Sequence, residues 1–150
     1  MNVSLTLTCD QHRTLQDHLF PGDGKEAVAF LLCGRAAYGD RHRLVVHQVV
    51  IISHQRCKRS VSRVSWDGED LVEHLDRAAV DQLSLVKVHS HPGGYAQFSA
   101  IDDESDHELL PTMASWVEHE GIQGSAIMLP DGRMFGRVYE PGHGLADAAN

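Results

Sequence analysis

Residues 85–92 read Leu-Val-Lys-Val-His-Ser-His-Pro, and Ser-Ala-Ile-Asp follows after six residues, at 99–102. The apolar residues of 85–88 predict a short strand whose end delivers His89. Ser99 is a favoured helix N-cap residue, and Asp102 then falls in the first helical turn, where the helix dipole stabilises acids. The stretch therefore predicts a strand, a loop and a helix in succession.

Hydrophobic periodicity predicts further elements before this unit. Apolar runs bounded by turn residues indicate strands, and apolar residues at helical spacing indicate helices. The predicted elements are a strand at 3–8, a short helix capped by Asp10 that runs through Leu15 and Leu19, buried strands at 27–33 and 44–52, a weaker strand within 58–65 that completes a meander, and a helix from Asp67 to Leu83.

The C-terminal third predicts a helix, a hairpin and a tail. Pro111 is expected to separate the helix that starts at Ser99 from a second helical stretch at 113–117, because proline lacks the N–H that a helix needs. Residues 125–129 and 134–139 predict a hairpin around Pro-Asp-Gly at 130–132. With a loose tail expected at 141–150, the predicted layout is one domain at 1–140 and a tail. These elements predict an α/β (α+β) fold, with a mixed curved sheet flanked by helices.

Composition limits the classes of protein to which the chain can belong. Its 150 residues are 42% hydrophobic and 23% charged, as in one water-soluble domain. A formal net charge of −8, with basic residues interspersed among acids, argues against nucleic acid as a partner. The sequence has neither an apolar run long enough to span a bilayer nor a signal-like N-terminus, so we expect a cytoplasmic protein that binds no membrane. Cys9, Cys33 and Cys57 are odd in number and widely spaced, which predicts reduced structural thiols.

The two histidines at 89 and 91 predict a metal site. Side chains at i and i+2 of an extended segment point the same way, so both imidazoles can reach one point in space. Catalytic zinc takes three protein ligands from histidine and carboxylate, and Asp102 is the natural third. From this chain's composition, His-x-His-Pro followed by Ser and Asp at these offsets has a chance of roughly 2 × 10⁻⁴, before discounting for the search over motifs. Coincidence is therefore a poor explanation.

The residues from His89 to Asp102 also resemble a known family. His-Ser-His-Pro, six residues and then Ser-Ala-Ile-Asp resemble the JAMM motif of the MPN+ metallopeptidases without a gap or a substitution. That family has a glutamate upstream, at the entry to an early buried strand that usually ends in Leu-x-Gly. Here Glu26 precedes Ala-Val-Ala-Phe-Leu-Leu-Cys-Gly, although Ala29 replaces a glycine often found there. The resemblance covers residues 3–140 and implies the MPN (JAB-type) architecture, which is cytidine-deaminase-like.

This resemblance implies one Zn²⁺ per chain, held by His89, His91 and Asp102, with its water hydrogen-bonded to Glu26. Glu26 would be the general base, and Ser99 would donate a hydrogen bond to the oxyanion of the tetrahedral intermediate. The implied activity is that of a deubiquitinase-like metalloprotease, an isopeptidase or peptidase that cleaves after the C-terminal glycine of a ubiquitin-like protein. The small size resembles bacterial members associated with ubiquitin-like ligation systems. The implied partners are a ubiquitin-like protein or its conjugates, together with ubiquitin-activating-like or ubiquitin-conjugating-like proteins.

Two other functions stay open within the same resemblance. One keeps the enzyme and changes the substrate to a sulfur carrier or a cell-wall peptide. The other is a non-catalytic scaffold, as in metal-free MPN subunits. Activity on a ubiquitin-like fusion would distinguish cleavage of a ubiquitin-like protein from cleavage of these other substrates. Stoichiometric zinc would exclude the scaffold.

Single residues also have simpler interpretations. Ser99 can act as a helix cap alone, Asp103 can replace Asp102 as the ligand, and Glu26 can be a solvated charge. We expect His107 to lie outside the site and Cys33 to be a structural thiol. The loop between His91 and Ser99 has two possible roles. It forms either a rim that admits an extended substrate tail or an ordinary connection, and its residues in question are Gly93, Gly94, Tyr95 and Phe98.

Overall fold

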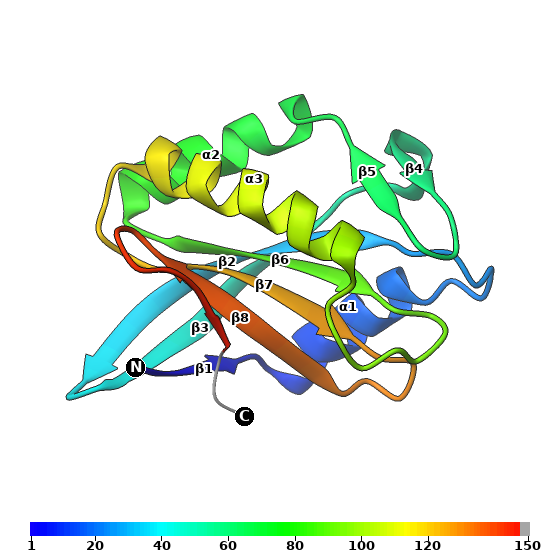
Figure 1. Cartoon of the computed structure of the whole chain (residues 1–150), viewed down its shortest axis with the longest axis horizontal. Helices are drawn as coiled ribbons and strands as arrows, with labels where there is room; N and C mark the ends of the chain where they lie inside the picture. Colours follow the sequence, from blue (N-terminus) through cyan, green and yellow to red (C-terminus); the bar gives the residue numbers. More distant parts are fainter. Residues whose placement is uncertain (148–150) are drawn as a thin grey trace.

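The computed structural model describes residues 1–147. The strands of the main sheet are β1 (Asn2–Thr6), β2 (Val28–Tyr38), β3 (Arg41–Ile51), β6 (Ser84–Ser90), β7 (Gln123–Met128), β8 (Met134–Glu140) and β9 (Gly144–Asp147), and the helices are α1 (Cys9–Leu19), α2 (Glu69–Asp81) and α3 (Ala100–Val117). This seven-stranded sheet has the order β1-β3-β2-β6-β7-β8-β9. Helices α2 and α3 cover one face and α1 lies on the other (Figure 1). The fold is thus the predicted α/β class.

Strand β2 separates the two hydrophobic cores. Because neighbouring side chains of a strand point to opposite faces, Ala29 and Leu31 pack on the α1 side, while Val28 and Phe30 pack against α2 and α3. A strand buried on both faces needs apolar residues at every position. This explains the continuous apolar run in the sequence.

The sheet is mixed, and β6 lies near its middle. It pairs antiparallel with β2 and parallel with β7. The predicted strands at 27–33 and 44–52 are confirmed as antiparallel neighbours, β2 and β3, and the predicted hairpin near the C-terminus is the antiparallel pair of β7 and β8. Strand β6 therefore presents its C-terminal end between two neighbours that fix it from both sides.

Helix α1 begins two residues earlier than a cap at Asp10 predicts. Its N-cap is Thr8, whose Oγ1 accepts the N–H of Gln11 at 3.0 Å, while the Gln11 side chain accepts the N–H of Thr8 at 2.8 Å. This reciprocal pair is a capping box. The predicted cap was wrong because Asp10, also a favoured cap residue, sits inside the first turn.

Helix α3 continues through Pro111, so the predicted interruption was wrong. Proline removes a single main-chain hydrogen bond and strains the turn before it, at a cost of about 3 kcal/mol. Leu110, Met113 and Val117 are buried on either side of it, and burial of each large apolar side chain contributes about 1.5–3 kcal/mol. Packing on the sheet therefore outweighs the cost of the proline.

The segment 57–66 differs from the predicted third strand of a meander. It forms two short strands, β4 (Cys57–Arg59) and β5 (Val64–Trp66), which pair only with each other as a separate two-stranded sheet. The 3-10 turn η1 (His54–Arg56) precedes them. This hairpin stands beside the α3 face of the main sheet (Figure 1).

The predicted tail is ordered where the structure describes it. Residues 144–147 form β9, which pairs antiparallel with β8 and extends the sheet. Leu145 packs against the core that lies under α2 and α3. Residues 148–150 of the predicted tail lie outside the described residues.

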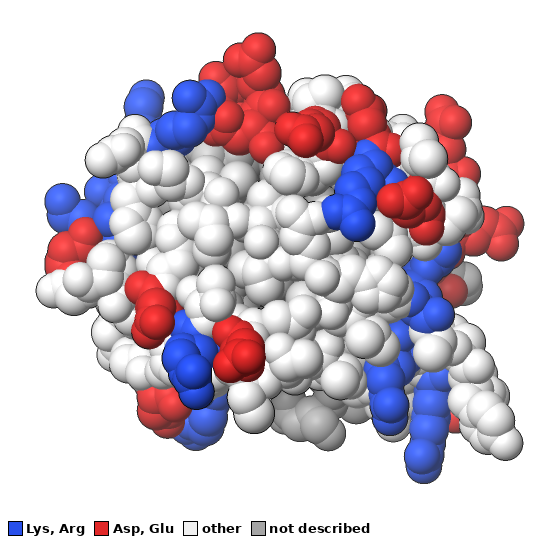
Figure 2. All heavy atoms as spheres, turned by 180° about the vertical axis from the view of Figure 1, so that it is seen from behind, with Lys and Arg blue, Asp and Glu red and all other residues white. Residues whose placement is uncertain are grey.

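Within residues 1–147, no helix is both long and apolar enough to cross a membrane. From behind, acidic side chains gather along the upper margin, where α2 and α3 lie in Figure 1, and basic side chains lie beside them there and in further groups lower on the face (Figure 2). Charged side chains of both signs therefore surround a largely uncharged centre on this face.

Candidate metal centre and its pocket

The C-terminal end of β6 positions both histidines. His89 lies within the strand, opposite Val28 of β2 and Ile127 of β7. Beyond the strand, the N–H of His91 donates to the carbonyl of Met128 at 3.1 Å. The main chain is thus held on both sides of the pair, and both side chains are buried.

Asp102 is fixed by the first turn of α3. The Ser99 side chain accepts the N–H of Asp102 at 3.1 Å, and Asp102 Oδ2 accepts the N–H of Ser99 at 2.8 Å. This second capping box confirms Ser99 as the N-cap. A short acid at this position cannot swing away without breaking the cap, so its carboxylate is held towards β6.

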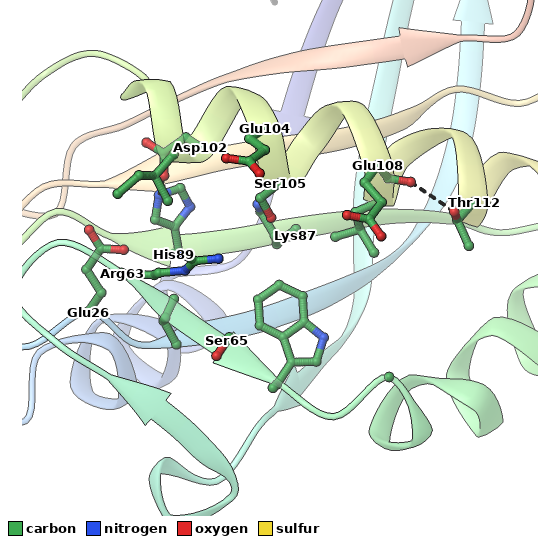
Figure 3. A pocket seen from close by; sticks show the side chains of 15 residues that line it. Glu26, Arg63, Ser65, Lys87, His89, Asp102, Glu104, Ser105, Glu108 and Thr112 are labelled. Carbon is green, nitrogen blue, oxygen red and sulfur yellow. Dashed lines mark hydrogen bonds and ion pairs between the residues drawn. The ribbon is translucent and has the colours of Figure 1, made fainter.

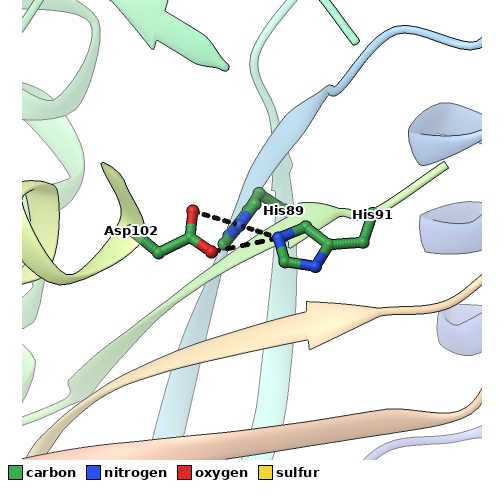
Figure 4. Close-up of side chains that lie close together, drawn as sticks. All are labelled: His89, His91 and Asp102. Carbon is green, nitrogen blue, oxygen red and sulfur yellow. Dashed lines mark hydrogen bonds and ion pairs between the residues drawn. The ribbon is translucent and has the colours of Figure 1, made fainter. Parts of the chain in front are cut away.

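The structure brings the three predicted ligands together (Figure 4). His89 Nε2 lies 2.9 Å from Asp102 Oδ1, His91 Nε2 lies 3.0 Å from Asp102 Oδ2, and the two Nε2 atoms are 3.2 Å apart. Ligand atoms that share a tetrahedral zinc ion at 2.0–2.1 Å are about 3.3 Å from one another. The spacing therefore fits one cation of this size.

A main-chain hydrogen bond orients the His91 ring, and burial determines the state of the His89 ring. His91 Nδ1 lies 2.7 Å from the carbonyl oxygen of Tyr95, so Nδ1 carries the proton and Nε2 faces the carboxylate. Burial lowers the pKa of His89 against the effect of Asp102, which keeps that ring neutral. Nδ1 of His89 is buried and has no hydrogen-bond partner within residues 1–147. Neutral imidazoles are the form that binds metal.

The protonation states of Asp102 and His91 follow from the contacts within the cluster. Burial alone would raise the pKa of Asp102, but hydrogen bonds from His89 and His91 outweigh it and hold the pKa far below its usual range. Burial would lower the pKa of His91, whereas Asp102 and the Tyr95 carbonyl together raise it. The cluster thus joins an ionised carboxylate to two imidazoles, a donor set suited to zinc.

Glu26 lies just before β2 and is buried, with 4% of its surface exposed. Its N–H donates to Ser60 at 2.8 Å, and Arg59 Nε donates to its carbonyl at 2.7 Å. The next residue, Ala27, donates its N–H to the hydroxyl of Ser90, which lies between the two histidines, at 2.9 Å. Burial raises the pKa of Glu26 to about 7. The predicted base is therefore not a solvated charge.

A pocket of about 340 Å³ connects Glu26 with the cluster. Glu26, His89 and Asp102 lie at one end of it, and Glu108 and Thr112 at the other (Figure 3). One wall is a face of α3 and the other is β5. The residues that line it besides those five are Arg63, Val64, Ser65, Trp66, Gly68, Lys87, Ile101, Glu104, Ser105 and Leu109.

Several of these residues escaped the sequence analysis. Trp66 contacts Phe30 edge to face and also lines the pocket. Lys87 stands in an apolar strand as an isolated charge. Its spacing of two from His89 is the signal that could have placed it on the same face.

The alternatives for single residues are settled in part. Asp103 pairs with Arg137 Nη1 at 2.7 Å and not with the histidines. His107 is exposed on α3. Cys33 is fully buried, and burial raises the pKa of its thiol to about 12, as expected for a structural cysteine. Ser99 caps α3, but whether it also contacts substrate stays a prediction.

The loop between β6 and α3 holds the predicted rim residues. Gly94 has φ +81, a conformation that favours glycine. Tyr95 is exposed, whereas the Phe98 ring packs edge to face on Phe135 and under the Arg137 guanidinium at 3.7 Å. Within residues 1–147 the lining of the pocket comes from other residues than this loop, so its contact with substrate stays a prediction.

Comparison with known proteins agrees with this architecture. Among solved structures, the chain is similar to the solution structure of protein DSY2949 from Desulfitobacterium hafniense, with 18% identity, a TM-score of 0.58, and coverage of 96% of this chain and 89% of that chain. At that identity the likeness shows the fold alone. No curated protein matches the chain. A family model described as prokaryotic homologs of the JAB domain matches residues 10–136, and the chain therefore belongs to this JAB domain family.

Proposed function

We propose that the protein is a zinc-dependent hydrolase that cleaves a peptide or isopeptide bond after the C-terminal glycine of a ubiquitin-like protein. The observation that carries the proposal is the convergence of His89, His91 and Asp102 at ligand spacing, with Glu26 in the same pocket. Some members of the JAB family are hydrolases, and this chain retains the full donor set.

Each residue has a definite task in this reaction. The three ligands would hold the ion, and a bound zinc ion supplies Lewis acidity that lowers the pKa of water to about 7. Glu26, whose pKa burial raises to about 7, takes a proton from the attacking water and passes it to the leaving amine. The Ser99 hydroxyl accepts an N–H through its oxygen, so its own hydrogen is free to donate to the developing oxyanion.

The pocket supports an extended polypeptide tail as the substrate. It follows one face of α3 from Ile101 to Thr112, a length of about 16 Å at 1.5 Å per residue. An extended chain rises about 3.3 Å per residue, so about five residues fit along it. The exposed carboxylates of Glu104 and Glu108 favour basic side chains in that tail. The choice of a ubiquitin-like protein rests on the resemblance to JAMM enzymes.

Zinc content and cleavage measured together test the proposal. We expect one zinc per chain by elemental analysis, and hydrolysis of a ubiquitin-like protein carrying a C-terminal extension. A chelator should abolish the activity and added zinc should restore it. Glu26→Gln should retain zinc and lose about 10²–10⁴-fold in kcat, because it cannot accept the proton. His89→Ala should lose both.

Three outcomes would contradict the proposal in whole or in part. A wild-type protein that is folded but holds no zinc would support a scaffold role. Full activity of Glu26→Gln would remove the proposed base. Cleavage of muropeptides or sulfur-carrier fusions, with none of the ubiquitin-like fusion, would keep the chemistry and change the substrate.

A further inference from the structure

A cluster of buried charges next to the metal site has no task in the proposed reaction. Lys87 of β6 and Asp106 of α3 form an ion pair with Nζ 2.5 Å from Oδ1, and their side chains are 3% and 0% exposed. Oδ2 of Asp106 accepts two more hydrogen bonds from Arg137 of β8, at 3.1 Å and 2.8 Å. Arg137 also pairs with Asp103. Three elements of the fold thus meet at one carboxylate.

The Lys87–Asp106 pair repeats the geometry of the metal ligands one step along both elements. Lys87 and His89 are two apart on β6, which separates them by about 6.6 Å on one face. Asp106 and Asp102 are four apart on α3, which separates them by about 6.0 Å on one face. The two pairs, Lys87–Asp106 and His89–Asp102, therefore lie side by side between strand and helix, at matched spacing.

We propose that Lys87 and Asp106 are positioning residues, which fix α3 along β6 so that the Asp102 carboxylate meets the two histidines. This inference rests on the proposed function. The Lys87 ammonium group here stands between strand and helix as, on the proposed function, a metal ion would in the neighbouring pair. Apolar contacts between a helix and a sheet allow small slides, whereas a paired and fully buried charge has one favourable position. The pair therefore sets the distance between ligands that come from different elements.

Arg137 extends the same control towards Ser99. Its guanidinium lies 3.7 Å from the Phe98 ring, and Phe98 immediately precedes the N-cap Ser99. Its bonds to Asp103 and Asp106 fall on the first two turns of α3. The helix end that carries both Ser99 and Asp102 is thus tied to β6 through Lys87 and to β8 through Arg137.

Zinc affinity is the direct measurement. Lys87→Met removes the ammonium but leaves Asp106 its two bonds from Arg137, so no carboxylate is left unpaired. We expect zinc affinity, measured by chelator competition, to fall roughly 10- to 100-fold, as for the loss of other groups that orient metal ligands. With zinc loaded, kcat should fall. The absorption bands of the cobalt-substituted protein should shift.

Arg56→Met is the matched control. Arg56 also forms an ion pair with a helix aspartate, Asp70 of α2, at 2.7 Å, but it is far more exposed. Loss of this pair should leave zinc affinity and the cobalt spectrum unchanged. An equal loss of affinity in both variants would overturn the inference, because it would show a general effect of removing a charge pair.

Asp106→Glu keeps the negative charge at position 106 and changes only where the carboxylate lies. It keeps both ion pairs but lengthens one partner by a methylene group, so α3 and β6 should fit less well and zinc affinity should fall. If Lys87→Met does not fold, this variant decides alone. Wild-type affinity in either folded variant overturns the inference and leaves the proposed function intact. Absence of zinc from the wild-type protein contradicts the proposed function itself, and the inference with it.

Discussion

At the scale of single residues, Glu26 has its carboxyl group in a buried position that disfavours the charged form. Its side chain is 4% exposed, and burial raises the pKa of the carboxyl group from 4.5 to about 7. A general base works best when its pKa lies near the working pH. The same burial must cost folding stability whenever the carboxyl group is ionised.

Glu26→Gln should therefore stabilise the metal-free protein at high pH. The folded-state pKa lies above the unfolded one, so the contribution of Glu26 to stability is complete below pH 4.5 and is lost as the pH rises through about 7. We expect the variant to exceed wild type by about 2 kcal/mol at pH 8 and to equal it at pH 4. This free energy is smaller than the one that the full difference between the folded and unfolded pKa values would give, because the group borders a pocket. Urea unfolding at both pH values measures it.

The matched control is Asp131→Asn, in a surface turn where Arg133 and main-chain hydrogen bonds lower the carboxyl pKa. Its folded pKa lies below the unfolded one, so its contribution is lost as the pH falls, the opposite sign. A Glu26→Gln variant less stable than wild type at pH 8 would contradict the burial argument.

The roles of single residues could be predicted from the sequence only in part. The motif at 89–102 predicted the two histidines and Asp102 as ligands, and strand periodicity explains why both imidazoles can reach one point, but the approach of Asp102 depends on the packing of α3 along β6. The burial of Glu26 was not predictable, because it depends on Ser60 and Arg59 far along the chain. His54 and His119 illustrate the same limit: each places a ring nitrogen on a main-chain carbonyl of a distant segment, at 2.8 Å and 2.7 Å.

At the scale of elements, α3 combines two tasks at its first turn. Ser99 caps the helix, and the proposed chemistry uses the hydroxyl of the same residue. Capping needs only a suitable backbone and an acceptor, whereas oxyanion binding needs the hydroxyl hydrogen. The two tasks can therefore be separated by substitution.

Ser99→Gly should keep the fold and lose turnover. Glycine is a tolerated N-cap that costs only about a few tenths of a kcal/mol relative to serine, while alanine costs about 1 kcal/mol. Both variants lack the hydroxyl and should lose about 10²–10³-fold in kcat. Ser99→Thr, which keeps cap and hydroxyl, is the control and should retain activity. Kinetics and thermal unfolding together check the prediction, and near wild-type kcat in the glycine variant would reduce Ser99 to a cap.

Elements were predicted well where local pattern decides them and poorly where packing does. The start of α3 follows from Ser99 and was correct. Its passage through Pro111 depends on the buried side chains around that proline, which local propensity does not include. The hairpin of β4 and β5 was merged into one strand because its short strands carry mixed polar residues and only their turn separates them.

At the scale of the whole molecule, β9 is the edge strand on one side of the main sheet. It pairs with β8, and Leu145 and Tyr139 pack against the core under α2 and α3. The sequence predicted a tail here because a four-residue strand that begins at a glycine is too short to show a periodicity. Only the finished sheet provides the partner that makes it a strand.

Leu145→Asp should therefore destabilise the protein without touching the site. Loss of a partly buried leucine and placement of a charge against the core should lower the free energy of unfolding by about 2 kcal/mol. Asp147→Asn, at the exposed end of the same strand, is the control and should change it by less than about 0.5 kcal/mol. Denaturant unfolding measures both. An unchanged midpoint for Leu145→Asp would mean that β9 adds nothing to the core.

The origin of the site's members along the chain has a consequence for biosynthesis. His89, His91 and Asp102 come from one short stretch, whereas Glu26 is synthesised much earlier and reaches them only once β2 has paired with β6. On the proposed function, a chain that is still incompletely folded therefore lacks its general base and cannot hydrolyse its neighbours. Proteolytic competence would then arise only with the completed tertiary structure.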